Sequence, residues 1–172
     1  EPRSAGRYVL ATDSAGPAIL GGWRFTGGAD PWRTFEASGA FPPPAPEPSA
    51  GEPTGAALAV PVPLAPGETR EVRMVFAWHV PVFFQAPGPD YGHYHARFFS
   101  SAEDVATYAL QNFDRICGEA GAVPRLLADS TLPGWLSRSL CNDAYVMSTA
   151  SWLTKDGRFA VNEGPTHMFG CM

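Results

Sequence analysis

One carboxylate in this sequence has a setting that suits catalysis by a rigidly held acidic side chain. Glu163 follows a short apolar run, residues 159–161, and is followed directly by Gly164 and Pro165. An Asp-Gly turn at residues 156–157 precedes the run, and Gly-Pro marks a sharp change of chain direction behind the carboxylate. Carboxylates that attack or protonate a glycosidic bond need such rigid positioning. Glu163 is therefore the candidate catalytic residue, although its local sequence alone fits an ordinary loop glutamate better.

Histidines provide the next candidates. His93 and His95 have the His-x-His spacing that places two imidazoles on one face of an extended segment, where they could bind a metal ion. Apart from Asp90, no nearby carboxylate or thiol completes a ligand set, so we favour a polar loop and predict no metal site. His167 is four residues from Glu163 and is the candidate substrate-binding residue, with a structural hydrogen-bonding role as the alternative.

Several other kinds of chemistry are not supported by the sequence. The 172 residues contain no Gly-x-Ser-x-Gly elbow and no glycine-rich phosphate-binding loop, and we predict no cofactor. The net charge is -5 and no Lys/Arg cluster exists, which argues against a nucleic-acid partner. No apolar stretch reaches the roughly 20 residues of a membrane-spanning helix, so we predict no transmembrane segment.

The composition is that of a globular protein, with 45% apolar and 17% charged residues. Cys117, Cys141 and Cys171 are far apart in the sequence and are predicted to be buried thiols. Residues 1–6 do not resemble a signal peptide and include no initiator Met, so we expect the chain to begin within a longer protein or after processing. The residues do not determine the compartment, with the cytoplasm slightly favoured.

The first half of the chain carries strand patterns. Short runs at 8–11, 22–26 and 56–60 are bounded by turn residues, and the clearest strand covers 68–80. That strand alternates polar and apolar residues and then becomes wholly apolar, which predicts one half-exposed end and one buried end. Together the runs predict antiparallel strands of a β-sandwich.

A proline-rich stretch interrupts these strands. Residues 41–66 hold nine of the eighteen prolines and must be extended or polyproline-like where prolines are consecutive. The stretch fits an interdomain linker, and it fits equally well a long loop that joins two strands of one sheet.

The second half of the chain is predicted to be helical. Ser100 and Ser101, each followed three residues later by an acidic residue, form overlapping capping boxes that open a helix over 101–117. A second helix is expected to start at 132–133, where proline suits the first turn, and to run to about Trp152. We expect Trp135 and Trp152 to be core residues rather than a sugar-binding platform.

The order of several segments resembles a known family. These segments are residues 76–81, 92–99, the helix 101–117, residues 130–136, 140–142, 156–159 and 162–164. Their succession is similar to that of family 116 glycoside hydrolases, which include bacterial and archaeal β-glucosidases and non-lysosomal glucosylceramidases. The resemblance extends from about residue 56 to the end of the chain, and its weight comes from the order of the segments.

The resemblance implies an α+β fold, in which an antiparallel β-sandwich portion is followed by helices leading into an (α/α)6 barrel. Residues 1–99 would be part of the amino-terminal sandwich, 100–131 a helical connector, and 132–172 the start of the catalytic domain. Most of the barrel would be absent from this chain, which would be a fragment spanning the end of one domain and the start of the next.

The resemblance also implies a function: a retaining glycoside hydrolase that acts on β-glucosides or glucosylceramide-like substrates by double displacement. Glu163 would be the nucleophile, and an aspartate expected beyond Met172 would be the acid/base. Retaining enzymes hold two such carboxyls about 5–5.5 Å apart, so the fragment alone is expected to be inactive. The implied partner is a carbohydrate or glycolipid substrate. Residues 164–169 depart from the acidic, aromatic-rich stretch typical of the family, which leaves the sugar and the aglycone open.

The alternative function is a non-catalytic β-sandwich that binds carbohydrate or another partner. The aromatic content, with eleven Phe, five Trp and five Tyr, fits this module equally well. The apolar end of the chain, residues 168–172, favours the enzyme, because an exposed apolar terminus is a liability for a complete module.

Overall fold

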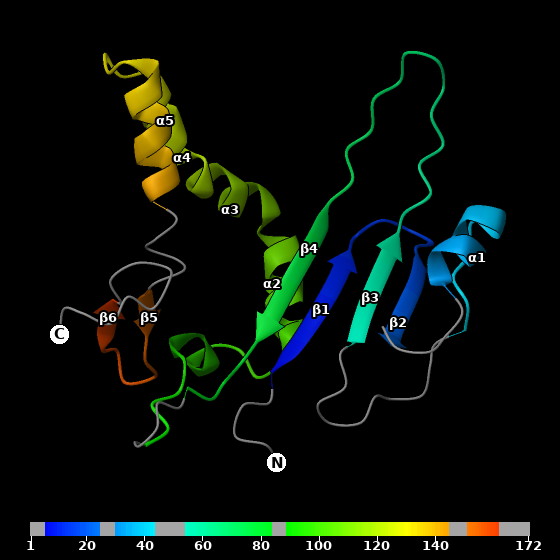
Figure 1. The fold of residues 1–172 in the computed structure, drawn as a ribbon, viewed down its shortest axis with the longest axis horizontal. Helices are drawn as coiled ribbons and strands as arrows, with labels where there is room; N and C mark the ends of the chain where they lie inside the picture. Colours follow the sequence, from blue (N-terminus) through cyan, green and yellow to red (C-terminus); the bar gives the residue numbers. More distant parts are fainter. Residues whose placement is uncertain (1–5, 25–29, 44–53, 84–88, 145–150, 162–172) are drawn as a thin grey trace. The chain divides into compact units, whose positions relative to one another are not determined.

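The computed structural model describes residues 6–24, 30–43, 54–83, 89–144 and 151–161 (Figure 1). The candidate residues Glu163 and His167, and the thiol of Cys171, lie outside the described residues. The chain divides into two compact units, one formed by Val9–Ala77 and the other by Glu1–Tyr8 together with Trp78–Met172.

The described residues combine helices with small sheets, which confirms a mixed α and β composition. The strands are β1 (Arg7–Thr12), β2 (Ala18–Arg24), β3 (Thr54–Ala59), β4 (Met74–His79), β5 (Ser151–Leu153) and β6 (Phe159–Val161). The helices are α1 (Pro31–Ser38), α2 (Ala102–Gln111), α3 (Phe113–Ala120), α4 (Ala122–Ala128) and α5 (Gly134–Asp143), with a 3-10 turn at Tyr94–Arg97. Among these strands, β1 pairs with β4, β2 with β3 and β5 with β6, each as a two-stranded sheet. The closed sandwich and the barrel stay predictions.

The proline-rich stretch joins two strands of one sheet. β2 and β3 pair in antiparallel fashion, with Ala18 opposite Ala59 and an irregularity between Leu20 and Trp23. Because β3 lies within this stretch and pairs with β2, the chain returns to the same sheet, so the loop interpretation is confirmed and the linker interpretation is wrong.

Helix α1 lies between β2 and the proline-rich stretch and was not predicted. The Asp30 side chain accepts a hydrogen bond from the Trp32 backbone N–H (3.0 Å), and Pro31 occupies the first turn. Gly39 ends the helix in the left-handed conformation, with φ at 68°. Asp30, Pro31 and Gly39 are all visible in the sequence as helix-boundary residues. A helix of eight residues, however, is too short for a repeating pattern of apolar residues to be recognised.

Strand β4 begins later than predicted and exposes one face. The Arg73 carbonyl, just before the strand, accepts a hydrogen bond from the Thr12 hydroxyl (2.8 Å). Along β4, Ala77 and His79 are buried, whereas Phe76 and Trp78 are exposed. The predicted burial of the wholly apolar end is therefore wrong, because side chains of a strand alternate between two faces and the structure covers only one of them.

The predicted helix over 101–117 is two helices. Ser101 caps α2 as expected, since its hydroxyl accepts a hydrogen bond from the Asp104 N–H (3.1 Å). The helix ends at Gln111. Asn112 follows with a backbone that is no longer helical, and its side chain donates to the Tyr108 carbonyl (2.9 Å). α3 continues past Cys117, which is exposed. The prediction that Cys117 is a buried thiol is therefore wrong, and Cys141 is only partly buried.

The second predicted helix starts as expected and ends early. Pro133 is the N-cap of α5, but the helix ends at Asp143 and Trp152 lies on strand β5. Trp135 is 67% exposed, so its prediction as a core residue is wrong. α4 was not predicted, although Pro124 suits its first turn. No helix among the described residues is long and apolar enough to span a membrane.

We expect Ser101→Ala to lower the free energy of unfolding by about 1 kcal/mol, because α2 loses its side-chain cap. Urea unfolding followed by circular dichroism measures the change. Ser101→Asp retains an acceptor at the same position and is the matched control, and equal destabilisation by both variants would contradict the capping role.

Candidate functional site

The hairpin that leads toward Glu163 has a well-defined register. β5 and β6 pair in antiparallel fashion, with Trp152 opposite Ala160 and Leu153 opposite Phe159. The turn between them is closed by a backbone hydrogen bond from the Gly157 N–H to the Thr154 carbonyl (2.9 Å). Gly157 has φ at 89°, a conformation that residues with a Cβ rarely adopt. The Asp-Gly turn predicted at this place is confirmed.

Side chains within the turn hold it closed. The Thr154 hydroxyl, with only 5% of the residue exposed, donates to the Asp156 carboxylate (2.5 Å) and accepts from the Arg158 N–H (3.0 Å). The Asp156 carboxylate also forms a salt bridge with the Arg158 guanidinium (3.0 Å). The hydrogen bond from Thr154 is the main reason that the pKa of Asp156 lies below its usual value. The turn is therefore stabilised whenever this carboxylate is ionised.

The hairpin is anchored to the segment that carries the His-x-His motif. The Lys155 N–H donates to the carbonyls of Tyr91 (3.1 Å) and Gly92 (3.0 Å), and His93 forms an antiparallel bridge with Thr154. Gly92 has φ at +58°, and a Cβ added there would lie 3.1 Å from the Lys155 Cβ. The two segments approach this closely because Gly92 has no side chain.

The Asp90 carboxylate fixes the backbone just before the His-x-His motif. Asp90 Oδ1 accepts hydrogen bonds from the backbone N–H groups of Phe83 (3.0 Å) and Gly92 (2.9 Å). Since one of these donors is only two residues away, the contact forms an Asx turn that orients the chain entering His93. Asp90, the one carboxylate near the His-x-His motif, therefore binds backbone N–H groups.

Three histidines lie together beside this anchor. The His79 and His95 rings have centroids 5.3 Å apart, and the His93 and His95 rings stack at 5.5 Å. His95 Nε2 accepts a hydrogen bond from the Val80 N–H (3.3 Å), while His79 Nε2 lies 3.1 Å from the Phe99 carbonyl and donates to it. Within the described parts of the chain, no group of three or more His, Cys, Asp or Glu residues is arranged to hold a metal ion.

Partial burial favours the neutral form of two of these imidazoles. It lowers the pKa of His93, against the opposing attraction of Asp90. It also lowers the pKa of His95, and the nearby His93 and His79 lower it further. Since Nε2 of His95 is occupied as an acceptor, the neutral ring carries its proton on Nδ1.

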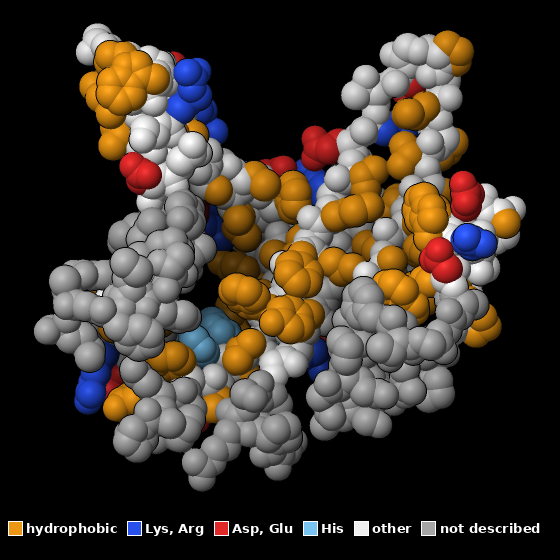
Figure 2. Space-filling view, in the orientation of Figure 1, with side chains coloured by type: hydrophobic (Ala, Val, Ile, Leu, Met, Phe, Trp, Pro, Cys, Tyr) orange, Lys and Arg blue, Asp and Glu red, His pale blue; other side chains and the backbone are white. Residues whose placement is uncertain are grey.

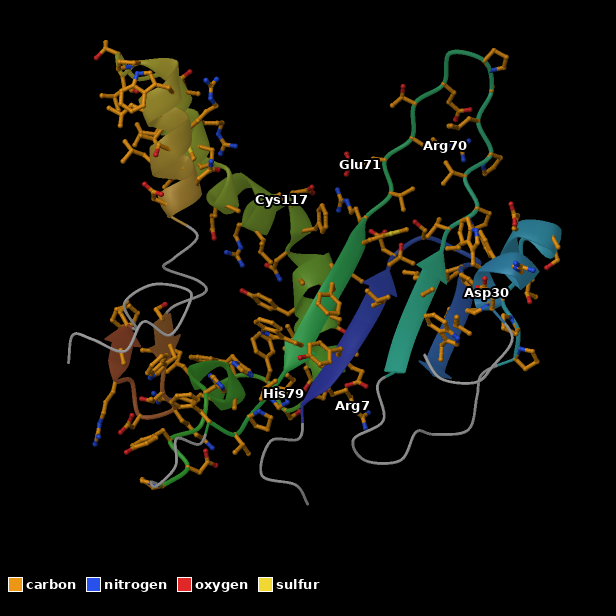
Figure 3. All side chains as sticks on the ribbon, viewed as in Figure 1. Arg7, Asp30, Arg70, Glu71, His79 and Cys117 are labelled. Carbon is orange, nitrogen blue, oxygen red and sulfur yellow. The ribbon has the colours of Figure 1, made fainter. Side chains whose placement is uncertain are left out.

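One end of the β1–β4 pair contributes the opposite side of the site. Figure 3 shows the labelled Arg7 and His79 at the same end of these two strands, whose arrows run in opposite directions in Figure 1. Arg7 forms an exposed salt bridge with Glu103 of α2 (3.2 Å), and the Tyr8 and Trp78 rings meet edge to face at 6.4 Å. The ring contact holds two aromatic side chains of different strands together, and the exposed ion pair adds little to stability.

These elements enclose a hollow of about 390 Å³ in the unit formed by residues 1–8 and 78–172. Its walls include four aromatic side chains and two imidazoles: Tyr8, Trp78, Tyr94, Trp152, His93 and His95. Figure 2 shows histidine side chains at the surface, bordered by hydrophobic side chains. The sequence alone does not indicate this site, because strand pairing and hairpin docking bring its residues together from distant positions.

The structure does not test the predicted site residues directly. Glu163 lies two positions after Val161, the last residue of β6, and His167 lies further along; both are outside the described residues. Of the residues considered for chemistry, His93 and His95 are brought together, beside Trp152. Because side chains of a strand alternate between two faces, the sequence of residues 74–79 could have placed Trp78 on an exposed face. No local sequence feature indicates that Trp78 and Trp152 line the same hollow.

A comparison with protein families finds a match over most of the chain. The sequence model of the family described as "beta-glucosidase 2, glycosyl-hydrolase family 116 N-term" matches residues 5–116. No curated protein and no solved structure matches the chain significantly.

We expect Gly157→Ala to destabilise the hairpin by about 1–2 kcal/mol, because the backbone there is left-handed and the added methyl meets no other atom. Gly118→Ala is the matched control. Gly118 lies inside α3, also in open space, so the substitution should stabilise by about 0.5–1 kcal/mol. Urea unfolding compares the two, and a change of the same sign in both would contradict the backbone account.

We expect stability to fall as the pH drops below about 6.5. The pKa values of His93 and His95 are lowered in the folded state, so the unfolded chain takes up protons first as the pH falls through 6.5. The contribution is therefore present above pH 6.5 and is lost between that value and the folded-state pKa. Urea midpoints between pH 7.5 and 5 measure the loss.

His95→Gln removes one titrating ring and offers an amide oxygen to the Val80 N–H. This variant should show a weaker pH dependence over the same range. A pH dependence equal to that of the unchanged chain would contradict the role of His95.

Proposed function

The chain belongs to glycoside hydrolase family 116, and on that premise we propose that it is part of a retaining glycosidase. The proposed substrates are β-glucosides or glucosylceramide-like compounds, and the reaction is a double displacement. The proposed architecture is a β-sandwich amino-terminal domain over residues 1–99, a connector over 100–131, and an (α/α)6 barrel that begins at residue 132.

The observation that carries the proposal is the match to this family over residues 5–116. The anchored hairpin supports it, because a nucleophile must be held rigidly against the anomeric carbon. The turn is closed by Thr154 and Asp156, and Lys155 binds it to the Gly92 segment. The hairpin that contains β6 is therefore held in place by these contacts, and Asn162 and Glu163 follow β6 directly in the sequence.

In the proposed reaction, the Glu163 carboxylate attacks the anomeric carbon while the bond to the leaving oxygen breaks. An acid, an aspartate expected beyond Met172, gives its proton to that oxygen. The same aspartate then takes a proton from water, the water oxygen bonds to the anomeric carbon, and Glu163 leaves as a carboxylate. Two inversions give net retention, and Glu163 must be ionised before the first attack, since a protonated carboxyl is a poor nucleophile.

His167 is proposed to contact the substrate. It follows Glu163 by four residues in the same segment. A neutral imidazole offers one donor and one acceptor, which suits a sugar hydroxyl.

A non-catalytic carbohydrate-binding role is the second candidate. It is favoured by β4, on which Phe76 and Trp78 are 65% and 61% exposed on the same face. Exposed aromatic rings on a strand suit the apolar face of a sugar. This role predicts sugar binding with no turnover in the natural protein.

We expect a 2-fluoro glucoside that traps the covalent intermediate to label Glu163 of the natural full-length protein. Peptide mapping by mass spectrometry locates the label, and a label on another residue would show that the assignment is wrong. Glu163→Gln should lower kcat for an aryl β-glucoside by roughly 10³-fold or more, because the nucleophile is lost. Glu119→Gln, at an exposed ion pair on α3, is the control and should leave kcat unchanged.

A further inference from the structure

The hollow beside the β5–β6 hairpin has the size of a small-molecule site. Its volume of about 390 Å³ lies within the roughly 300–1,000 Å³ that is usual for ligand pockets. Trp152 forms part of its wall, and this residue pairs with Ala160, three residues before Glu163. The hollow is therefore connected through the hairpin to the segment that carries the proposed nucleophile.

Several aromatic walls are held in place by neighbouring rings. Trp152 contacts Phe83 (ring centroids 5.3 Å apart), and Tyr94 meets Phe98 edge to face at 5.3 Å. On the other side, Tyr8 and Trp78 support each other at 6.4 Å. Such contacts restrict the rings before a ligand arrives, which lowers the entropic cost of binding.

Polar groups at the hollow are few and uncharged at neutral pH. The neutral ring of His93 offers a donor and an acceptor, whereas His95 offers only the N–H at Nδ1, because its Nε2 already accepts a hydrogen bond from the Val80 N–H. Ser151 adds a hydroxyl-bearing residue to the lining. Asn or Gln amides are not among the lining residues that the structure describes.

The charge of the walls selects the class of ligand. None of the described lining residues is a Lys, Arg, Asp or Glu, so a phosphate, carboxylate or ammonium group would lose its hydration without gaining an oppositely charged partner. A purely apolar ligand would leave the two imidazoles without hydrogen bonds from the ligand. A pyranose is neutral, has a C–H face that stacks on aromatic rings, and has a rim of hydroxyls.

We propose that this hollow binds one neutral pyranose unit of a β-glucoside, stacked on Trp152 or Trp78 and hydrogen-bonded to His93 and His95. The inference rests on the proposed function for the choice of sugar. It adds a sugar subsite built from β1, β4, the His-x-His segment and β5.

The test measures binding of methyl β-D-glucopyranoside to the natural full-length protein carrying Glu163→Gln, by calorimetry. Trp152→Ala and Trp78→Ala should each weaken the affinity about tenfold, the effect of losing one aromatic stacking partner. Trp78 is on β4, so a loss there cannot be attributed to distortion of the nucleophile hairpin. Trp152→Phe keeps an aromatic face and should restore most of the affinity.

Trp135→Ala is the matched control, because this exposed tryptophan lies on α5 and does not line the hollow. Unchanged affinity in both Trp152→Ala and Trp78→Ala, or no glucoside binding at all, would overturn the proposal. Tighter binding of 1-octanol than of the glucoside, lost in the same variants, would also overturn it, since the hollow would then bind an alkyl chain.

The two proposals can fail separately. Labelling of Glu163 together with unchanged glucoside affinity in the tryptophan variants would overturn the subsite and retain the nucleophile. Tryptophan-dependent glucoside binding with no label on Glu163 would support the subsite and overturn the nucleophile.

Discussion

The backbone contact between Lys155 and the carbonyls of Tyr91 and Gly92 is the constraint on which the site depends. It joins two segments that are distant in the sequence, and it forms because Gly92 has no side chain in the way. Every wall of the hollow contributed by β5 is placed by this contact. The same contact gives the hairpin a fixed base from which the chain continues toward Glu163.

The histidine cluster follows from the same packing. When the hairpin and the end of β4 surround His93 and His95, burial disfavours the charged form of both rings. Proximity of His79 and His93 to His95 adds like-charge repulsion, so a proton on one ring opposes a proton on the next. A lining that is aromatic and uncharged at neutral pH results, and this property decides which ligands the hollow can accept.

Much of the local structure could be predicted from particular residues. Ser101 opens α2, Pro133 opens α5 and the Asp-Gly pair turns the β5–β6 hairpin, since each relies on groups within four residues of one another. Predictions that needed distant neighbours were less successful. Cys117 and Trp135 were expected to be buried because of their residue type, but whether a helix face is covered depends on what packs against it.

The helix predicted to run to Trp152 was wrong for a related reason. An apolar pattern of this length is compatible with a helix or a strand, and the pairing of Trp152 with Ala160 decides in favour of the strand.

The sequence by itself determined the family, because the order of the segments can be read along the chain. It also determined the caps and the turns, because these depend on interactions of Ser, Pro, Asp and Gly with residues close to them in the sequence. Only the tertiary structure decided that Tyr8, Trp78, Tyr94 and Trp152 surround one hollow with two neutral histidines. The physical reason is that strand pairing and the close approach at Gly92 bring together residues that have no local interaction, and burial then sets their charge.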